Sequence, residues 1–316
     1  MKSLRLISQF FVSTLFIALL FFVSACEEVP PFIDFSPPPP IDLTCADKGK
    51  LSADEFSKTN TDFVSSELPE AQCKMVLIEE FSGVRCVNCP AGHETTADIL
   101  ESRPDEVAAL TIHAGFLSTP YAENKEDYVI EAGTSLYDLF QTIAVPAAAV
   151  ERVKYEGENF VSLINRNVWA GKANERLQLT PPMNVYTNFD YNPSTRELQV
   201  YVRAHYLEAF DNSEGHQMSV SLSESHIIDH QLIPVDGGSS TIQADYEHNH
   251  VLRAMLTPSS GVGLDVERVE GTVIDRVFST TLPDHWKPED MEIIAFIHDA
   301  TTNHILQTAK KHIEVQ

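Results

Sequence analysis

Two cysteines separated by two residues are the part of this sequence best suited to chemistry. Cys86 and Cys89 lie between a predicted buried strand and a predicted helix, with Pro90 directly after them. Unpaired backbone N–H groups and the helix dipole stabilise an anion at a helix N-terminus, so Cys86 is expected to form a thiolate more easily than a free cysteine. Cys89 could then attack a mixed disulfide on Cys86, and the pair could exchange two electrons with a substrate disulfide.

Two other interpretations of the cysteine pair remain open. The pair could be a structural disulfide on a scaffold recruited for binding. It could also join Cys45 and Cys73 in a metal site, although zinc sites with four cysteines usually contain two closely spaced pairs. Cys45 and Cys73 are instead expected to form a structural disulfide that fixes an N-terminal extension to the first strand. Closing that loop would stabilise the fold by about 3–4 kcal/mol in the chain-entropy model. We expect no metal and no cofactor.

Alternating strands and helices are expected to position the cysteine pair. Short apolar runs predict buried strands at 74–81, 107–116 and 147–153. Helices are expected at about 52–58, 90–102, 134–142 and 159–177. The order of these elements predicts an α/β domain with an N-terminal extension over residues 42–178.

Residues 179–316 have a different pattern, with alternating apolar residues and almost no helical periodicity. Strands are predicted at 185–189, 198–202, 218–223, 251–257, 273–282, 291–298 and 305–313. Seven short strands of this kind favour an all-β, immunoglobulin-like sandwich. We expect this domain to bind a partner or to shield the face that carries the cysteine pair.

The start of the chain has the order of an export signal. Lys2 and Arg5 precede an apolar run that ends in Val23-Ser24-Ala25-Cys26. This ending resembles the lipobox of bacterial lipoproteins, in which a peptidase cleaves before a lipid-modified cysteine. Residues 1–25 are therefore predicted to be a signal peptide, with Cys26 as the lipidation site. Residues 26–41 are rich in proline and are predicted to be a semi-rigid linker.

Charge limits the choice of partners. The formal net charge of −24 should repel the phosphates of nucleic acids, so no nucleic-acid partner is expected. His248 and His250 could hold a metal together with His226 or His230, but we interpret them as polar residues of a loop and a strand edge.

Residues 74–177 resemble the thioredoxin fold. Glu80, six residues before Cys86, matches a buried acid that assists proton transfer at the second cysteine, and Pro146 matches a cis-proline beside the dithiol. The resemblance implies that Cys86 is the nucleophile, Cys89 the resolving thiol, Glu80 the proton-transfer acid and Pro146 a substrate-side residue. Glu80 could alternatively be a partly exposed carboxylate at the strand end. Arg85 departs from the family pattern, which usually has tryptophan there, so the redox direction stays open.

A narrower resemblance covers most of the chain. The segments LIEEFSGVRCVNCPAGH (77–93) and EHNHVLR (247–253) are similar to the twenty-eight-kilodalton outer-membrane lipoprotein family. This resemblance implies a lipid-anchored protein of the outer membrane that faces the periplasm or the cell surface. The expected partners are protein thiols or disulfides, the membrane through the lipid anchor, and a membrane reductase or oxidase. The competing function is a non-enzymatic surface lipoprotein for binding or adhesion.

Overall fold

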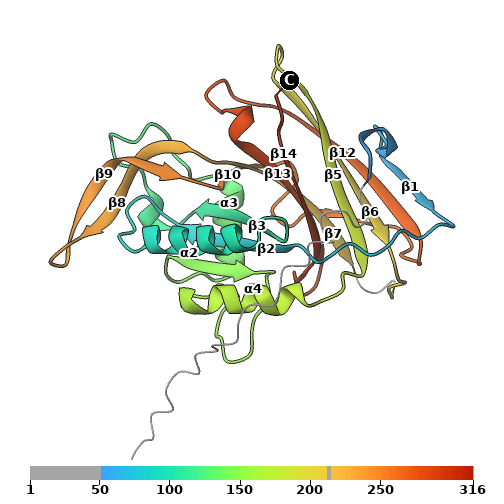
Figure 1. The fold of residues 1–316 in the computed structure, drawn as a ribbon, viewed down its shortest axis with the longest axis horizontal. Coiled ribbons are helices and arrows are strands. Elements are labelled where there is room, and N and C mark those ends of the chain that lie inside the picture. The colour runs from blue at the N-terminus through green and yellow to red at the C-terminus, as the bar shows by residue number, and fades with distance from the viewer. Residues whose placement is uncertain (1–50, 212–214, 316) are drawn as a thin grey trace, which may run out of the picture. The chain divides into compact units, whose positions relative to one another are not determined.

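β-Strands make up most of the structure, and the helices are few (Figure 1). The computed structural model describes residues 51–211 and 215–315. Cys26, Cys45, the predicted signal peptide and the predicted linker lie outside these residues. Within them, no helix has the length and apolar character needed to cross a membrane.

The strands and helices predicted between 74 and 150 are all present. In chain order they are β2 (Val76–Ser82), α2 (Cys89–Ser102), β3 (Val107–His113), α3 (Glu131–Leu139) and β4 (Ala147–Val150). β2 and β3 are parallel, and every residue of both strands is buried, including Glu79 and Glu80 of β2. β4 runs antiparallel to β2 on the other side. The β2 strand therefore lies between two others, which fixes the start of the loop that carries the cysteines.

The helix predicted over 159–177 is wrong in its first part. The structure has a 3-10 turn, η4 (Arg166–Val168), followed by α4 (Trp169–Leu177). Leu163 instead pairs with Ala148 through two backbone hydrogen bonds, of 2.8 and 3.0 Å. The Trp169 indole N–H also donates to the Leu163 carbonyl. This pairing holds Leu163 against β4, so its side chain reaches the core without a helix.

The remaining strands form two facing sheets and a separate hairpin. The further strands are β1 (Thr61–Val64), β5 (Met183–Asn192), β6 (Glu197–Tyr206), β7 (His216–Glu224), β8 (Ile227–Val235), β9 (Ser239–His248), β10 (Val251–Met255), β11 (Val262–Gly263), β12 (Thr272–Thr281), β13 (Met291–Asp299) and β14 (Ile305–His312). One sheet has the order β1-β12-β6-β5. The other has the order β14-β13-β7-β10-β3-β2-β4, with β11 paired to β7. The 3-10 turn η5 (Pro288–Asp290) precedes β13, and the helix expected near 52–58 is the short 3-10 turn η2 (Ala53–Glu55).

The larger sheet runs across the boundary predicted at residue 178. β10 joins β3 through a parallel pairing, in which the Thr111 N–H donates to the His250 carbonyl at 2.7 Å. β13 contributes to two cores, because successive side chains of a strand point to opposite faces. Ile294 and Phe296 pack with residues of β2 and β3, whereas Ile293 and neighbouring alternate residues pack between the two sheets. The apolar side chains of β13 therefore belong to the cores of both parts of the chain.

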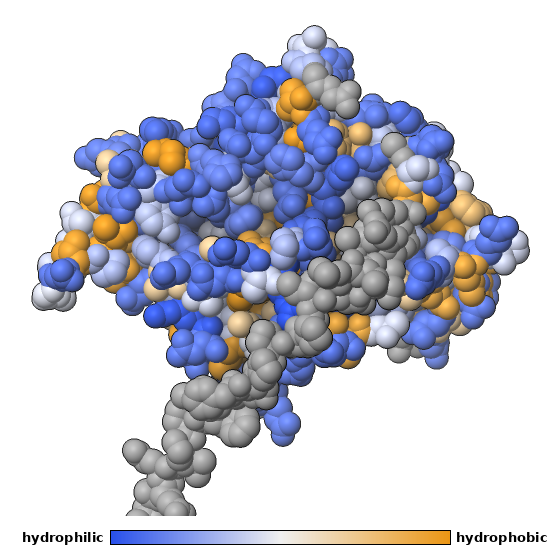
Figure 2. Space-filling view, viewed as in Figure 1, coloured by the Kyte–Doolittle hydropathy of each residue, from blue (hydrophilic) through white to orange (hydrophobic). Residues whose placement is uncertain are grey.

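The β8–β9 hairpin was not expected from the sequence. Among the described residues its two strands pair only with each other, and Gly237 and Gly238 at its turn have positive φ angles of 82° and 79°. Three of its apolar side chains are exposed: Ile228, Val235 and Ile242. Figure 2 shows these apolar patches at the left of a face that is otherwise mostly hydrophilic.

Candidate functional site

The cysteine pair lies in a tight connection between β2 and α2. Cys86 and Cys89 form a disulfide, with a Cα–Cα distance of 5.3 Å. Cys89 is the first residue of α2, and Pro90 occupies a first-turn position, where its missing N–H has no intrahelical partner to lose. The connection also passes close to the residues after β3, because a Cβ on Gly83 would lie 2.5 Å from the Leu117 carbonyl oxygen. Position 83 therefore requires glycine, because any Cβ would clash with the Leu117 carbonyl.

The structure brings together all four residues to which the thioredoxin resemblance gives a role. The Cys86 Sγ atom lies 3.5 Å from the Val145 carbonyl oxygen, and the Val145–Pro146 peptide bond is cis. Gly92, one turn into α2, has no Cβ and so allows Glu80 and Pro146 to approach the helix closely. A Cβ on Gly92 would meet Glu80 Oε1 at 2.5 Å and Pro146 Cβ at 2.7 Å. Glu80 and Pro146 therefore approach α2 from β2 and from the residue before β4.

Glu80 is fully buried, which excludes its interpretation as a partly exposed strand-end carboxylate. Thr96 Oγ1 donates to Glu80 Oε2 at 2.6 Å, while Oε1 has no hydrogen-bond partner among the described residues. Burial raises the pKa of Glu80 to about 8, although the Thr96 hydrogen bond acts in the opposite direction. The neighbouring Glu79 differs, because Arg152 donates two hydrogen bonds to its carboxylate, at 2.6 and 2.7 Å. Glu80 is therefore a buried carboxyl group with no cation that fixes its charge.

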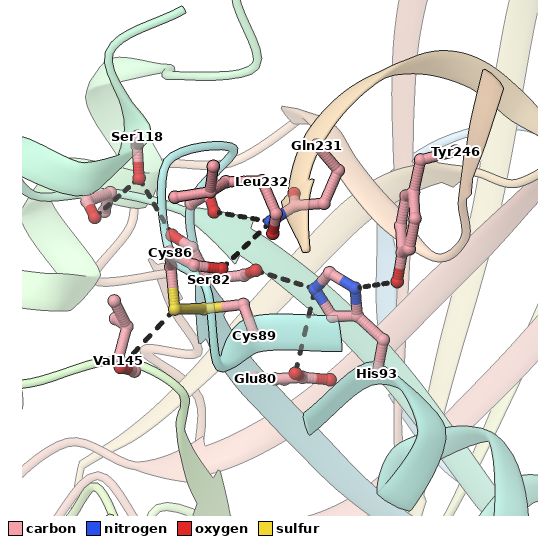
Figure 3. Close-up of a disulfide and its surroundings, with 12 residues drawn as sticks. Glu80, Ser82, Cys86, Cys89, His93, Ser118, Val145, Gln231, Leu232 and Tyr246 are labelled. Atoms are coloured by element: carbon pink, nitrogen blue, oxygen red, sulfur yellow. Dashed lines mark hydrogen bonds and ion pairs between the residues drawn. A yellow bond between two sulfur atoms is a disulfide. The ribbon is translucent and has the colours of Figure 1, made fainter. Parts of the chain in front are cut away.

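His93 also belongs to this group, although no role was predicted for it. Figure 3 shows its ring between Glu80, Ser82 and Tyr246. His93 Nε2 lies 2.7 Å from Ser82 Oγ and 3.9 Å from Glu80 Oε1, and Nδ1 lies 2.7 Å from the Tyr246 hydroxyl. The position of His93 four residues after Cys89 was a usable signal, since residues at i and i+4 share a helix face.

The β8–β9 hairpin covers the backbone of the cysteine loop. Gln231 Nε2 donates to the Gly83 and Cys86 carbonyl oxygens, and the Leu232 N–H donates to the Val84 carbonyl at 2.8 Å (Figure 3). Cys86 is only 2% exposed and Cys89 is 0% exposed. The disulfide is thus enclosed in this structure, and part of the enclosure comes from the second half of the chain.

Arg85 anchors the loop from the opposite side. Its guanidinium donates to the Thr119 and Pro120 carbonyl oxygens at 2.6 and 2.7 Å and lies 4.3 Å from the centre of the Tyr121 ring. The residue that departs from the thioredoxin pattern therefore ties the cysteine loop to the segment after β3.

The prediction for His248 was wrong. His248 is 1% exposed, and its ring contacts those of His113, Tyr128 and Tyr246. Burial lowers the pKa of His248 to about 4 and holds that of His113 well below its ordinary value. The aromatic contacts explain the burial, because the His248 ring at the end of β9 packs on the His113 ring at the end of β3. Among the described residues, no three side chains from His, Cys, Asp and Glu are arranged as metal ligands.

Comparisons with known proteins match residues 134–316 to a protein family and find a solved structure with a similar fold. A family model described as outer membrane protein Omp28 matches residues 134–316. The structure of HBP35 of Porphyromonas gingivalis matches with a TM-score of 0.57 and 18% identity over 76% of this chain and 75% of that chain, which shows a similar fold. A domain of the outer membrane lipoprotein Omp28 from Porphyromonas gingivalis has 20% identity and a TM-score of 0.30, over 43% of this chain and 91% of that chain. The search of curated proteins found no match.

Proposed function

Because this chain belongs to the Omp28 family of outer-membrane proteins, we propose that it is a lipoprotein that exchanges disulfides with extracytoplasmic proteins. The environment of the Cys86–Cys89 disulfide carries this proposal. The disulfide lies at the start of α2, with the Val145 carbonyl beside Cys86 and the buried carboxyl group of Glu80 close to the same helix. A cysteine pair beside a helix N-terminus and a buried acid contains the groups that thiol–disulfide exchange requires.

In this proposal, residues 42–178 are a thioredoxin-like domain and residues 179–316 an immunoglobulin-like sandwich. Two features support the first assignment: α2 connects the parallel strands β2 and β3, and β4 is antiparallel to β2. The facing sheets around a common apolar core support the second. The contacts of the β8–β9 hairpin with the cysteine loop support a shielding role for the second domain.

Each site residue has one proposed role in the exchange. The Cys86 thiolate attacks a substrate disulfide and forms a mixed disulfide, and Cys89 then displaces the substrate thiol. Glu80 transfers the proton of Cys89, and Pro146 lies on the substrate side. The substrate gains two electrons, and a membrane reductase returns them to the pair; an oxidase would serve the opposite direction.

Lipid attachment to Cys26 would hold the protein at the outer membrane, facing the periplasm or the cell surface. The lipobox-like sequence supports this assignment. Replacing Cys26 with serine should abolish incorporation of radiolabelled fatty acid and release the protein from the membrane fraction.

The reduction potential of the Cys86–Cys89 pair tests the proposed exchange. It can be measured on the chain carrying Cys26→Ser, by equilibration with dithiothreitol or glutathione buffers. A value within roughly −120 to −270 mV, the range of known exchange proteins, is expected. A value below about −300 mV would identify a structural disulfide and exclude the exchange reaction.

A non-enzymatic surface lipoprotein is the second candidate, and the burial of both cysteines favours it. In that case the disulfide would only brace the loop before α2. The alkylation rate of Cys86 near neutral pH, after mild reduction, distinguishes the two functions. Fast alkylation supports exchange, whereas a rate below that of a free cysteine supports the structural disulfide.

A further inference from the structure

The buried acid Glu80 has no direct route to water through its own hydrogen bonds. One carboxyl oxygen accepts from Thr96 and the other is unpartnered among the described residues. An acid that serves repeated exchange reactions has to release and regain a proton in every cycle. Glu80 lines a cavity yet is 0% exposed, so a neighbouring group that reaches further out would connect it to solvent.

His93 is placed to make this connection. Its Nε2 faces Glu80 Oε1 at 3.9 Å, and its Nδ1 faces away, toward the Tyr246 hydroxyl at 2.7 Å. Ser82 Oγ is the other partner of Nε2. Hydroxyl groups can donate or accept, so both neutral tautomers of the imidazole satisfy these contacts. A proton can enter at one ring nitrogen while another leaves from the second.

A cavity of about 250 Å³ lies on the outer side of this chain of groups. The titratable side chains that line it are Glu80, His93 and Glu94, and on the facing strand and turn Tyr246, Glu247 and His250. Glu94 and Glu247 are exposed, so the cavity reaches the surface. Water in the cavity could take up the proton, and the exposed carboxylates could pass it to bulk solvent.

We propose that His93 is a positioning residue that acts through Glu80 and carries protons between Glu80 and this cavity. The Tyr246 hydroxyl on β9 orients the His93 ring. This inference rests on the proposed exchange reaction. In the mixed disulfide, Cys89 gives its proton to the Glu80 carboxylate, and the Cys89 thiolate forms the S–S bond with Cys86. The bond from Cys86 to the substrate sulfur breaks, and the substrate thiolate takes a proton from solvent. Glu80 then passes its proton to His93 Nε2 through one bridging water, because their 3.9 Å separation exceeds a direct hydrogen bond, and His93 releases the Nδ1 proton toward the cavity.

The acidities of the two groups agree with these roles. Burial raises the pKa of Glu80 to about 8, so both of its protonation states are accessible near neutral pH. Burial, together with His248 and His250, lowers the pKa of His93 to about 3, so the imidazole rests neutral. A neutral imidazole between an acid and water relays a proton without keeping it.

Chemical rescue tests the proposal on the full chain. The reduced protein is oxidised by glutathione disulfide, and the rate of Cys86–Cys89 bond formation is measured against pH. His93→Ala should slow this step at least about tenfold, in line with the usual contribution of proton transfer. Added imidazole, which fits the vacated space, should restore much of the rate in the variant and leave the wild type unchanged.

Two further variants separate the relay from a loss of folding. Tyr246→Phe keeps the ring that packs on His248 and removes the hydroxyl, so it should slow the step less and make the rate depend on buffer concentration. His285→Gln alters an exposed histidine that does not line the cavity and is the control. An unchanged rate in His93→Ala, or a loss that imidazole does not restore, overturns the proton route alone. A wild type that does not react with glutathione disulfide overturns the exchange reaction and the route together.

Discussion

Burial sets the protonation of single residues around the disulfide, and His113 is the clearest case. It is 2% exposed, lies among the rings of Tyr128 and His248, and has no hydrogen-bond partner for either ring nitrogen among the described residues. Burial holds its pKa well below the ordinary value of about 6.5, with smaller contributions from His248 and His93. The folded state therefore binds fewer protons than the unfolded chain at mildly acidic pH.

His113→Phe should make the protein less sensitive to acid. With a lowered folded-state pKa, the stability linked to His113 is fully present above pH 6.5 and is lost as the pH falls below it. Each unit of lowered pKa corresponds to about 1.4 kcal/mol. Urea unfolding of the oxidised protein at pH 7 and pH 5 should show a smaller stability loss in His113→Phe than in wild type, while His226→Gln should behave as wild type. Equal losses in all three proteins would mean that His113 is not kept neutral by the fold.

Sequence reasoning at the scale of residues worked where spacing along one element decides the geometry. Glu80 and Cys86 are linked by the end of one strand, so their spacing was informative. Tyr246 and Gln231 escaped because they reach the site from the β8–β9 hairpin, whereas His93 lies on the same helix as Cys89 and its spacing was overlooked. The burial of His248 was not predicted, because histidine is commonly a polar surface residue. Only the ring contact between the ends of β3 and β9 shows that it is buried.

Among the elements, the β8–β9 hairpin is the one whose movement would uncover the cysteine loop. It pairs with no other strand, and a two-stranded hairpin alone is marginally stable. Its hold on the loop is a few hydrogen bonds, chiefly from Gln231 and Leu232. Such an element is expected to open more easily than the sheets behind it.

Gln231→Ala should increase the rate at which dithiothreitol reduces the Cys86–Cys89 disulfide. The variant loses the hydrogen bonds to the Gly83 and Cys86 carbonyls, each worth about 1 kcal/mol, so opening should become roughly thirtyfold more frequent. Ser240→Ala, near the exposed hairpin turn, is the matched control. If Gln231→Ala lowers the thermal unfolding midpoint but leaves the reduction rate unchanged, the hairpin does not control access to the disulfide.

Most elements were predictable from apolar patterns, and two of the failures, the β8–β9 hairpin and the segment 159–165, have physical causes. The hairpin strands carry many exposed polar residues, so their alternation is weak, although Asp236-Gly237 is a recognised turn signal. The segment 159–165 has helical spacing, but its pairing with β4 through Leu163 overrides that preference.

At the scale of the whole molecule, the two parts of the chain depend on each other for their cores. Ile294, Phe296 and Ile305 complete the cluster around β2 and β3. Arg152, paired with Glu79, also lies 4.7 Å from the centre of the Phe296 ring. The continuous sheet could not be predicted from the sequence. Neither half shows which of its edge strands pairs with a strand of the other half.

A fragment of residues 51–178 should therefore fail to fold cooperatively, since it would expose the core side that β13 and β14 cover. Amide NMR dispersion and thermal unfolding of the fragment check this expectation. In the full chain, Phe296→Ala should cost about 3–5 kcal/mol, as for other large buried aromatic residues. A fragment with dispersed amide signals and a sharp transition would show instead that residues 42–178 are an independent domain.

The shared strand β13 also bears on how such a gene can change over time. One face of this strand is shaped by the α/β elements and the other by the opposing sheet. A recombination event that joined the first half of this chain to the second half of a distant relative would place mismatched side chains on one of those faces. Successful exchanges near residue 178 should be rare, and substitutions around Phe296 should accumulate as compensating pairs across the two halves.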